Sequence, residues 1–444
     1  MWLQALHRLR MGGVLADDMG LGKTLQVIAL LLWAKEREQT RMPSVVVAPT
    51  SLVYNWMAEI RRFAPGLRAV AAEGSQSARA QAIAALTSPD CDIDVYITSY
   101  PLIRRDIGQL ACVPFRFAIL DEAQYIKNAM SVGANAVKQL RAQSRFALTG
   151  TPMENHPGEL WSIFDFVLPG YLLSFAQFMH RFGAGEDVDA LRQRIRPFLL
   201  RRLKGDVLRE LPEKIETQLL ADMTEEQRRV YQASLLRLRP QVEGAQSHIE
   251  VLAAITELRQ ICGHPSLVLD DYAASSGKLD LLLDILPGAL EAGHRALLFS
   301  QFTRMLRILQ RRLETAGISC LYLDGETPPR RRIELVERFN AGEGQVFLIS
   351  LKAGGSGLNL VGADTVIHFD PWWNPAAEDQ ATDRAHRIGQ KRAVNVIRLI
   401  TRDTIEEQVV RLGERKRALF EQMITAGETM PTQLSPEDIR ALFE

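Results

Sequence analysis

The sequence predicts an α/β protein with two parallel-sheet lobes, a helical segment between them and a helical C-terminal tail. Two observations predict this class: short β-branched runs alternate with helical patterns, and they occur in two separate sets. A chain of 444 residues is also too long for one compact core. The first set of strand-like runs covers residues 45–48, 95–98, 117–120 and 146–148. The second set covers residues 296–299, 320–323, 346–350, 365–369 and 394–399.

Residues 153–280, between the two sets, show helical patterns and no strand pattern. The expected helices cover residues 159–167, 174–182, 188–203, 225–238 and 248–261. Helical patterns return after Thr404, to about residue 424 and again over residues 438–443. We therefore expect a first lobe at 1–168, helical protrusions and a linker at 169–275, a second lobe at 276–430 and a tail at 431–444.

The composition is that of an ordinary globular protein, with 47% apolar and 24% charged residues. Basic and acidic residues balance at 53 each, so any nucleic-acid-binding surface has to be local. The four cysteines form no Cys-x-x-Cys pair, which argues against a zinc site and predicts reduced thiols. No apolar run is long enough to span a membrane, and the first ten residues do not resemble a signal peptide.

The run DDMGLGKT at residues 17–24 is typical of a phosphate-binding turn. Gly20 and Gly22 allow backbone N–H groups to point inward, and a helix N-terminus adds partial positive charge. We expect Lys23 to reach the β- and γ-phosphates and the Thr24 hydroxyl to hold Mg²⁺. Asp17 stands where the strict pattern has glycine. The alternative is a Gly-rich turn before an ordinary helix.

A second motif, which is acidic, follows the apolar strand at residues 117–120, about a hundred residues after the phosphate-binding turn. Asp121 is the expected Mg²⁺ ligand, and Glu122 is expected to orient or deprotonate an attacking water. The alternative is an acidic strand end in solvent. Thr149, at the end of the next strand, is expected to hydrogen-bond the acidic motif or a phosphate; the alternative is a plain turn.

Three runs in the second half carry arginine, glycine and tryptophan. In QATDRAHRIGQ, residues 380–390, Gln380, Arg384 and Arg387 share one face if the segment is helical. Two arginines there suit a phosphate clamp, and a solvated basic face is the alternative. The glycines of LKAGGSGLNL, residues 351–360, allow close approach to a phosphate or form a tight turn. In DPWWNP, one tryptophan is expected to pack and the other to face a partner.

The ordered motifs resemble those of the Swi/Snf-type family of superfamily-two helicase-like ATPases. They are DDMGLGKT, VVVAPTSLVYNW, LDEAQYIKN, LTGTPMEN, LLFSQFT, SLKAGGSGLNL, DPWWNP and QATDRAHRIGQ, and the resemblance runs from about Trp2 to about residue 420. It implies two RecA-like P-loop lobes with ATP between them, duplex DNA across the cleft and movement along DNA without strand separation. Gln124 stands where many relatives have histidine.

The resemblance assigns roles to individual residues. The nucleotide contacts would be Asp17, Asp18, Met19, Gly20, Leu21, Gly22, Lys23, Thr24, Asp121 and Gln124. The catalytic groups would be Lys23, Glu122, Gln380, Arg384 and Arg387, with Thr24 and Asp121 on Mg²⁺. Hydroxyls and backbone N–H groups at strand ends suit a sugar–phosphate backbone, although simple helix caps are the alternative. The expected DNA contacts are Pro49, Thr50, Ser99, Thr149, Gln301, Lys352, Gly354, Gly355 and Trp372.

One departure from the family concerns adenine recognition. Trp2 and Gly13 hold the family's spacing before the phosphate-binding turn, so the adenine-recognising glutamine would fall a few residues before Met1. Either the start is cut or misassigned, or the chain is a fragment of a longer polypeptide. The alternative, that the protein lacks the segment, predicts weak nucleotide selectivity.

The resemblance implies an ATP hydrolase that depends on DNA, translocates on double-stranded DNA and remodels or displaces protein–DNA complexes. ATP and Mg²⁺ are the expected cofactors. The DNA-bound cargo would be RNA polymerase, a nucleoid protein or a nucleosome. A strand-separating helicase is one alternative, and a catalytically impaired DNA-binding scaffold with a truncated ATP site is another. We expect a monomer without membrane contact in the bacterial cytoplasm at the nucleoid, or in the nucleus of a eukaryote.

Overall fold

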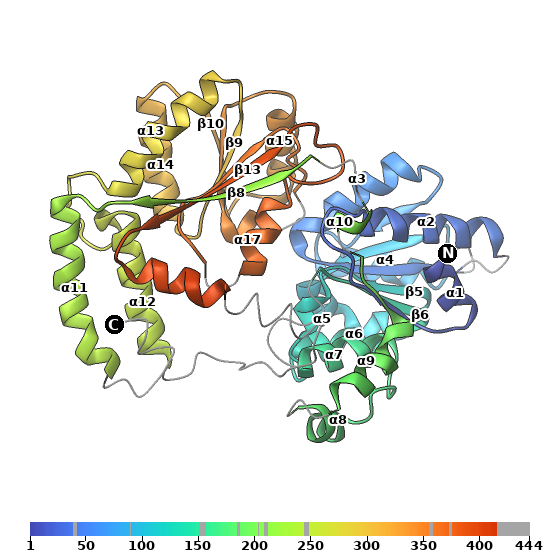
Figure 1. Ribbon diagram of the computed structural model, residues 1–444. Helices are drawn as coiled ribbons and strands as arrows, with labels where there is room; N and C mark the ends of the chain where they lie inside the picture. Colours follow the sequence, from blue (N-terminus) through green and yellow to red (C-terminus); the bar gives the residue numbers. More distant parts are fainter. Residues whose placement is uncertain are drawn as a thin grey trace. The chain divides into compact units, whose positions relative to one another are not determined.

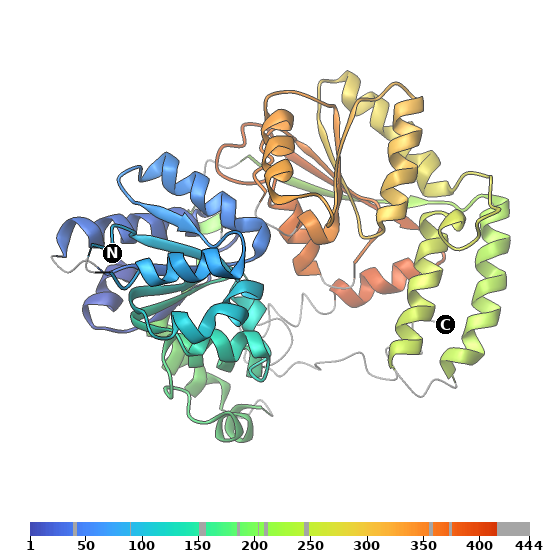
Figure 2. The same cartoon turned by 180° about the vertical axis from the view of Figure 1, so that it is seen from behind.

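The computed structural model describes most of the chain in two compact units (Figures 1 and 2). Among the described residues, the first unit extends to residue 207 and the second runs from residue 212 to residue 414. The described ranges are residues 1–38, 42–88, 90–150, 157–183, 187–202, 204–207, 212–243, 248–354, 358–372 and 375–414. Each unit contains one sheet covered by helices, which confirms the predicted α/β class.

The first unit is built on a seven-stranded sheet with the order β3-β4-β2-β5-β6-β1-β7. Every strand pair in it is parallel. The strands are β1 (Gly13–Leu15), β2 (Ser44–Ala48), β3 (Ala69–Ala71), β4 (Val95–Ser99), β5 (Pro114–Leu120), β6 (Arg141–Leu148) and β7 (Leu199–Leu200). All five residues of β2 and of β4 are buried, as expected of a parallel sheet with helices on both faces.

Alternate strand residues divide the core of the first unit into two layers. Val46 and Ile97 pack with α1 (Trp2–Arg8), α2 (Lys23–Arg37) and α3 (Val53–Phe63) on one face of the sheet. Val45 and Tyr96 pack on the other face. The helices there are α4 (Gln76–Ala85), α5 (Tyr100–Leu110), α6 (Val132–Lys138), α7 (Pro157–Val167) and α8 (Phe175–Phe182). The chain continues through α9 (Val188–Ile195) and α10 (Lys204–Val207).

The second unit has a six-stranded parallel sheet with the order β10-β11-β9-β12-β13-β8. The strands are β8 (Lys214–Ala221), β9 (Ala296–Ser300), β10 (Cys320–Leu323), β11 (Val346–Ser350), β12 (Thr365–His368) and β13 (Val394–Thr401). Helices α13 (Gly277–Glu291) and α14 (Thr303–Thr315) cover one face. Helices α15 (Pro329–Asn340) and α17 (Pro375–Thr382) cover the other. The short α16 (Leu351–Gly354) follows β11.

A helical pair extends from the second unit. Helices α11 (Glu225–Glu243) and α12 (His248–Gly263) lie side by side in both views (Figures 1 and 2). Residues 405–414 are also helical and share a core with this pair. That core contains Tyr231, Leu238, Val251, Ala254, Ile255, Leu258, Ile261, Cys262, Ile405 and Val409.

Two expectations about the middle of the chain were wrong. The predicted helix over residues 188–203 ends at Ile195, and β7 pairs with β1 instead. The expectation of no strand between residues 153 and 280 fails at β8, an edge strand whose exposed side chains are both polar and apolar. Its sequence has no continuous apolar run, and backbone pairing with β13 along its full length holds it in the sheet. The expected helix at 438–443 and the chain after residue 414 lie outside the described residues.

The predicted 169–275 segment contributes to both units. Its first helices, α8 and α9, pack into the core of the first unit. Its strand β8 and the helical pair α11–α12 belong to the second unit. The division therefore falls near residue 209, between α10 and β8.

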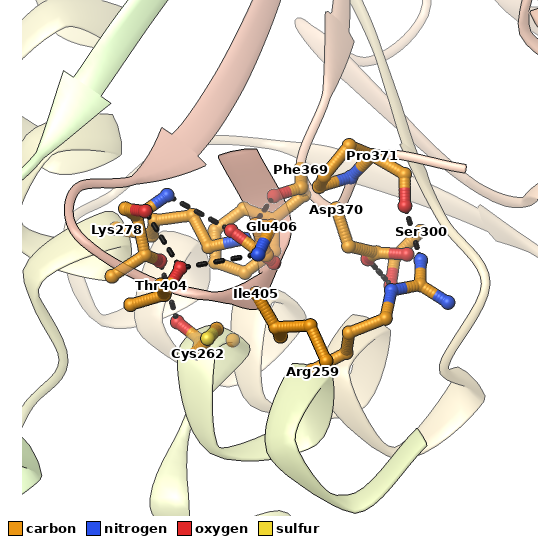
Figure 3. Close-up of polar contacts among 12 residues, drawn as sticks. Arg259, Cys262, Lys278, Ser300, Phe369, Asp370, Pro371, Thr404, Ile405 and Glu406 are labelled. Atoms are coloured by element: carbon orange, nitrogen blue, oxygen red, sulfur yellow. Dashed lines mark hydrogen bonds and ion pairs between the residues drawn. The ribbon is translucent and has the colours of Figure 1, made fainter. Parts of the chain in front are cut away.

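A fully buried ion pair joins three parts of the second unit (Figure 3). Lys278 Nζ lies 2.6 Å from Glu406 Oε1, and neither side chain is exposed. Lys278 also donates to the Phe369 carbonyl just after β12, at 2.9 Å. The second carboxylate oxygen of Glu406 accepts the Thr401 N–H at the end of β13, at 2.9 Å. The pair therefore ties the start of α13 and the helix at 405–414 to the end of the sheet.

We predict that Lys278→Met destabilises the protein by about 3–5 kcal/mol, because it leaves the Glu406 carboxylate buried without its cation. The double variant Lys278→Met/Glu406→Leu should regain much of this stability, since both charges are gone. Urea unfolding, monitored by circular dichroism, measures the free energy of unfolding of both variants. Arg229→Met is the control, because its pair with Glu225 is exposed and 3.7 Å long. A Lys278→Met loss as small as that of the control would contradict the prediction.

Candidate functional site

The carboxyl ends of the first sheet bring together residues from distant parts of the sequence. Strands β1, β2, β4, β5 and β6 are all parallel, so their carboxyl ends meet at one edge. The segments that follow them are residues 17–24, Pro49–Thr50, Tyr100, Asp121–Glu122 and Thr149. Open parallel sheets bind ligands at this edge.

The Gly-rich turn has the conformation expected of a phosphate cradle. Gly20 and Gly22 have φ angles of 85° and 70°, a region in which glycine has no Cβ to clash. Helix α2 begins at Lys23 and directs its N-terminus toward this turn. Lys23 Nζ donates to the Asp17 carbonyl at 2.6 Å and to the Asp18 carbonyl at 3.3 Å. Phosphate oxygens are also hydrogen-bond acceptors, so the Lys23 ammonium group can replace its bonds to these two carbonyls with bonds to phosphate.

The environment of Lys23 combines burial with negative charge. Burial lowers the pKa of Lys23, and the nearby carboxylates of Glu122, Asp121, Asp17 and Asp18 oppose this shift. The Lys23 ammonium group therefore lies among four acids. A metal ion beside the acids would redistribute this balance, since it brings its own charge.

Asp17 anchors the turn to the chain that follows β7. Its carboxylate is fully buried and bonds the Arg202 guanidinium through Nη2 at 2.5 Å and Nε at 3.0 Å. Gln26 Nε2 donates to the same carboxylate at 3.1 Å. Asp18 accepts the Lys204 backbone N–H at 3.0 Å. The structure therefore explains the acidic residue at the first motif position by an ion pair, and sequence reasoning missed its partner 185 residues away.

Asp121 and Glu122 lie where β5 ends. Asp121 is buried, and its carboxylate accepts the Trp56 indole N–H at 2.8 Å and the Glu122 backbone N–H at 3.0 Å. The Tyr100 hydroxyl donates to the Asp121 carbonyl at 2.9 Å. Glu122 adopts a left-handed backbone with φ 51°, which is strained for a residue with a Cβ. Such strain is common where the fold fixes a functional side chain.

The pKa of Asp121 is raised to about 7, chiefly by burial and then by the neighbouring charge of Glu122. The Trp56 hydrogen bond and the Lys23 charge act in the opposite direction. Because the folded-state pKa lies above its usual range, the folded protein loses stability as the pH rises toward 7 and Asp121 ionises. A cation bound to the carboxylate would offset this loss.

A hydrogen-bonded chain joins Glu122 to the end of β6. Gln124 Nε2 donates to Glu122 Oε2 at 2.8 Å, and the Thr149 hydroxyl donates to Gln124 Oε1 at 3.0 Å. Thr149 thus bonds Gln124, which in turn bonds Glu122 of the acidic motif. Thr151 and Pro152, which follow Thr149 in the run LTGTPMEN, lie outside the described residues.

The second unit also gathers its predicted residues at a carboxyl edge. Gln301 follows β9, Lys352 and Gly354 follow β11, and Trp372 follows β12. Gly355 and Trp373 lie outside the described residues. Gln380 lies on α17 and is half-buried.

The condition under which Gln380, Arg384 and Arg387 would share one helix face is not met. Helix α17 ends at Thr382, and the two arginines lie in the turns that follow. Arg384 is buried and donates through Nε to the Gly354 carbonyl at 3.1 Å. Arg387 donates through Nη1 to the Leu358 carbonyl at 3.2 Å. Each of the two arginines is therefore held by a bond to a backbone carbonyl after β11 and not by helix periodicity.

The expected DNA contacts differ in their exposure. Thr50 and Lys352 are exposed, and Gln301 and Trp372 are half-buried. Pro49, Ser99, Thr149 and Gly354 are buried. Ser99 precedes the first turn of α5, and its hydroxyl is buried with no hydrogen-bond partner among the described residues.

Among the described residues, no group of three or more His, Cys, Asp or Glu side chains could hold a metal ion. A metal at Asp121 would therefore complete its coordination with phosphate and water oxygens, as Mg²⁺ commonly does. None of the described helices has the length and apolar character that a membrane crossing requires.

Family models match both units. The model of the SNF2-related domain matches residues 1–267. The model of the helicase conserved C-terminal domain matches residues 277–389.

Similar proteins occur in bacteria, animals and archaea. The putative ATP-dependent helicase/translocase YwqA of Bacillus subtilis is 40% identical over 460 residues, covering 100% of this chain and 50% of that protein. The human SWI/SNF-related matrix-associated actin-dependent regulator of chromatin subfamily A member 1 is 38% identical over 453 residues, covering 97% of this chain and 43% of that protein. The chain thus spans about half the length of these relatives.

One similar solved structure is the Sulfolobus solfataricus SWI2/SNF2 ATPase core in complex with dsDNA. Its sequence is 36% identical, the match covers 100% of this chain and 95% of that chain, and the TM-score is 0.47.

We predict that Trp56→Phe raises the pKa of Asp121 further, because it removes the indole N–H that stabilises the ionised carboxylate. The carboxyl ¹³C shift of labelled aspartate, followed against pH, measures the titration midpoint. Asp121→Asn identifies the signal. Trp33→Phe is the matched control, because Trp33 contacts His7 and Arg8 in the same layer. A midpoint that stays at the wild-type value in Trp56→Phe would refute the assignment of this bond.

Proposed function

We propose that this chain, which belongs to the SNF2-related family, is the motor part of a DNA-dependent ATPase that translocates on double-stranded DNA. Its activity would remodel or displace protein–DNA complexes. The observation that carries the proposal is the grouping of Lys23, Asp121 and Glu122 at one carboxyl edge, beside a Gly-rich turn at a helix N-terminus. The relatives named ATP-dependent helicase/translocase and regulator of chromatin support the same class.

The reaction would be in-line attack of water on the γ-phosphate of ATP. The new bond joins the water oxygen to phosphorus, and the bond between the γ-phosphorus and the β–γ bridging oxygen breaks. Glu122 would position the water and accept its proton, with its orientation fixed by Gln124. Lys23 would exchange its bonds to the turn carbonyls for phosphate oxygens and neutralise charge on the leaving group.

Asp121 and Thr24 fit a bound Mg²⁺. Asp121 offers a carboxylate whose ionisation in the buried site is unfavourable without a cation, and Thr24 is the second residue of α2. When bound, Mg²⁺ would neutralise phosphate charge. The Trp56 N–H would keep the carboxylate of Asp121 in a single orientation.

The second unit would supply the remaining positive charge. Arginine stays ionised and can bond phosphate through two donors, which suits Arg384 and Arg387 for stabilising the transition state. Gln380, on the preceding helix, would assist them. Their bonds to the Gly354 and Leu358 carbonyls would fix the positions of the two guanidinium groups before they bind phosphate.

DNA would be held mainly through its phosphates. The chain has no net charge, so binding would rely on local donors at the carboxyl edges of the two sheets, such as Thr50 and Lys352. Such contacts are tolerant of sequence and weaken as the salt concentration rises. The cargo would be a DNA-bound protein complex, and the site of action would be the bacterial nucleoid or the eukaryotic nucleus.

We predict that Lys23→Ala and Glu122→Gln each lower DNA-stimulated ATP turnover by about a hundredfold or more, because each removes a preorganised group at the reacting phosphate. Phosphate release with and without duplex DNA measures this. Lys35→Ala is the control, since Lys35 lies on the same helix and pairs with Asp94 at 2.6 Å. Near-normal turnover in either site variant would exclude the assignment. Absence of turnover in the wild-type chain would favour a non-catalytic scaffold.

We also predict that the chain displaces the third strand of a DNA triplex in the presence of ATP and leaves a forked duplex paired. A translocating motor moves along the duplex without opening it, whereas a helicase separates the strands. Fluorescent strand-release assays on both substrates distinguish the two activities, with Lys23→Ala as the inactive control. ATP-dependent unwinding of the fork would favour the strand-separating alternative.

A further inference from the structure

An arginine from the helical pair reaches the loops at the carboxyl edge of the second sheet. Arg259 lies on the last turns of α12, and only 1% of its surface is exposed. Figure 3 shows its side chain extending from α12 toward Pro371. Burial of a guanidinium group is unfavourable unless its donors are satisfied, so its contacts here are informative.

The Arg259 guanidinium bonds two different loops. Nη1 donates to the Gln301 amide oxygen, after β9, at 3.2 Å. Nη2 donates to the Pro371 carbonyl, after β12. The guanidinium carbon also lies 6.0 Å from the Phe302 ring centre and 5.4 Å from that of Trp372. A planar group with several donors and affinity for aromatic faces suits this combination, and lysine would not reproduce it.

Asp370 joins the same two loops from a second direction. Its carboxylate accepts the Ser300 hydroxyl and, at 3.0 Å, the Gln301 backbone N–H. Figure 3 shows Ser300 and Asp370 in contact beside the Arg259 guanidinium. Strands β9 and β12 are neighbours in the sheet, so these bonds fix the relative position of the loops that follow them.

Trp372 is in turn bonded to α17. Its backbone N–H donates to Glu378 Oε1 at 2.7 Å, and Glu378 Oε2 accepts the Arg398 Nε–H at 2.9 Å. The backbone around Trp372 is therefore held by Arg259 on one side and by Glu378 on the other.

We propose that Arg259 is a positioning residue for nucleic-acid binding, holding Gln301 and Trp372 in the arrangement that the DNA backbone meets. The inference rests on the proposed function, because it takes these two side chains as DNA contacts. Arg259 does not itself touch the DNA. By binding the amide oxygen of Gln301, it fixes which end of the amide faces the guanidinium. The NH₂ group of Gln301 is itself buried and has no hydrogen-bond partner among the described residues, so the role that we propose for Arg259 is to hold the loop after β9 in place.

This role makes the helical pair part of the DNA-binding apparatus. Helices α11 and α12 share a core with residues 405–414. Arg259 is the point at which that helical cluster bonds the loops after β9 and β12. A ligand or partner that shifts α12 would therefore change the loops at the sheet edge.

The test compares Arg259→Met with Leu258→Ala by fluorescence anisotropy on a labelled duplex, without ATP. Leu258 is the neighbouring residue on α12, is fully buried and contacts the helical core rather than the loops. We expect Arg259→Met to raise the Kd for the duplex by about tenfold, the effect of losing hydrogen bonds from a charged group. Arg259→Lys should lie between wild type and Arg259→Met. Leu258→Ala should lower the urea midpoint and leave the Kd within about twofold.

A double-mutant cycle separates positioning from a general loss of stability. If Arg259 acts through Gln301, then Arg259→Met should weaken binding by less than about twofold further in a Gln301→Ala background, because coupled residues are not additive. If Arg259→Met and Gln301→Ala each raise the Kd about tenfold and these two effects multiply in the double variant, the proposal is overturned. So would an unchanged Kd in Arg259→Met, or an equal rise in Leu258→Ala.

The same experiment distinguishes failure of this inference from failure of the proposed function. Wild-type chain that binds the duplex and shows DNA-stimulated turnover, with Arg259→Met indistinguishable from it, overturns the inference alone. Wild-type chain with no measurable duplex affinity overturns the inference together with the proposed DNA activity.

Discussion

Parallel pairing of the strands is the constraint on which both units depend. In a parallel sheet every strand ends at the same edge, so short segments far apart in the sequence become neighbours. The first sheet brings together the Gly-rich turn, the Asp121–Glu122 pair and Thr149 in this way. The second sheet does the same for Gln301, Lys352 and Trp372. Because helices cover both faces, the central strands are mostly apolar, and the residues that we propose for nucleotide and DNA binding lie mainly in the segments that follow the strands.

Buried charges then determine how those loops are held. Asp17, Asp121, Arg259, Lys278, Arg384 and Glu406 are all buried, and each bonds a partner on another element or loop. Removing a charge from water is unfavourable, so each contact has to be geometrically good to be tolerated. Such contacts specify one arrangement of a loop more strictly than apolar packing does, because hydrogen bonds are directional. The nucleotide-binding and DNA-binding sites that we propose lie beside these buried charged residues.

The accuracy of sequence-based prediction followed the strength of the local signal. The apolar runs at β2, β4, β5, β9 and β11 were predicted because burial on both faces leaves a continuous apolar pattern. Strand β8 was missed because its sequence carries no such pattern and pairing with β13 defines it. The arginines of the last motif would share a helix face only in a helical segment, and Arg384 and Arg387 instead lie in turns held by backbone carbonyls.

The sequence by itself determined the α/β class, the family resemblance and the Lys23, Asp121 and Glu122 roles that we propose. These features depend on local spacing: glycines before a helix start, and acids directly after an apolar strand. Only the tertiary structure decided that Asp17 pairs with Arg202, that Gln124 joins Thr149 to Glu122, and that Arg259 lies beneath the loops at the second sheet edge. The Thr149–Gln124, Arg259–Gln301 and Asp17–Arg202 contacts join residues separated by 25 to 185 positions, and no local pattern encodes which distant polar group will satisfy a buried charge.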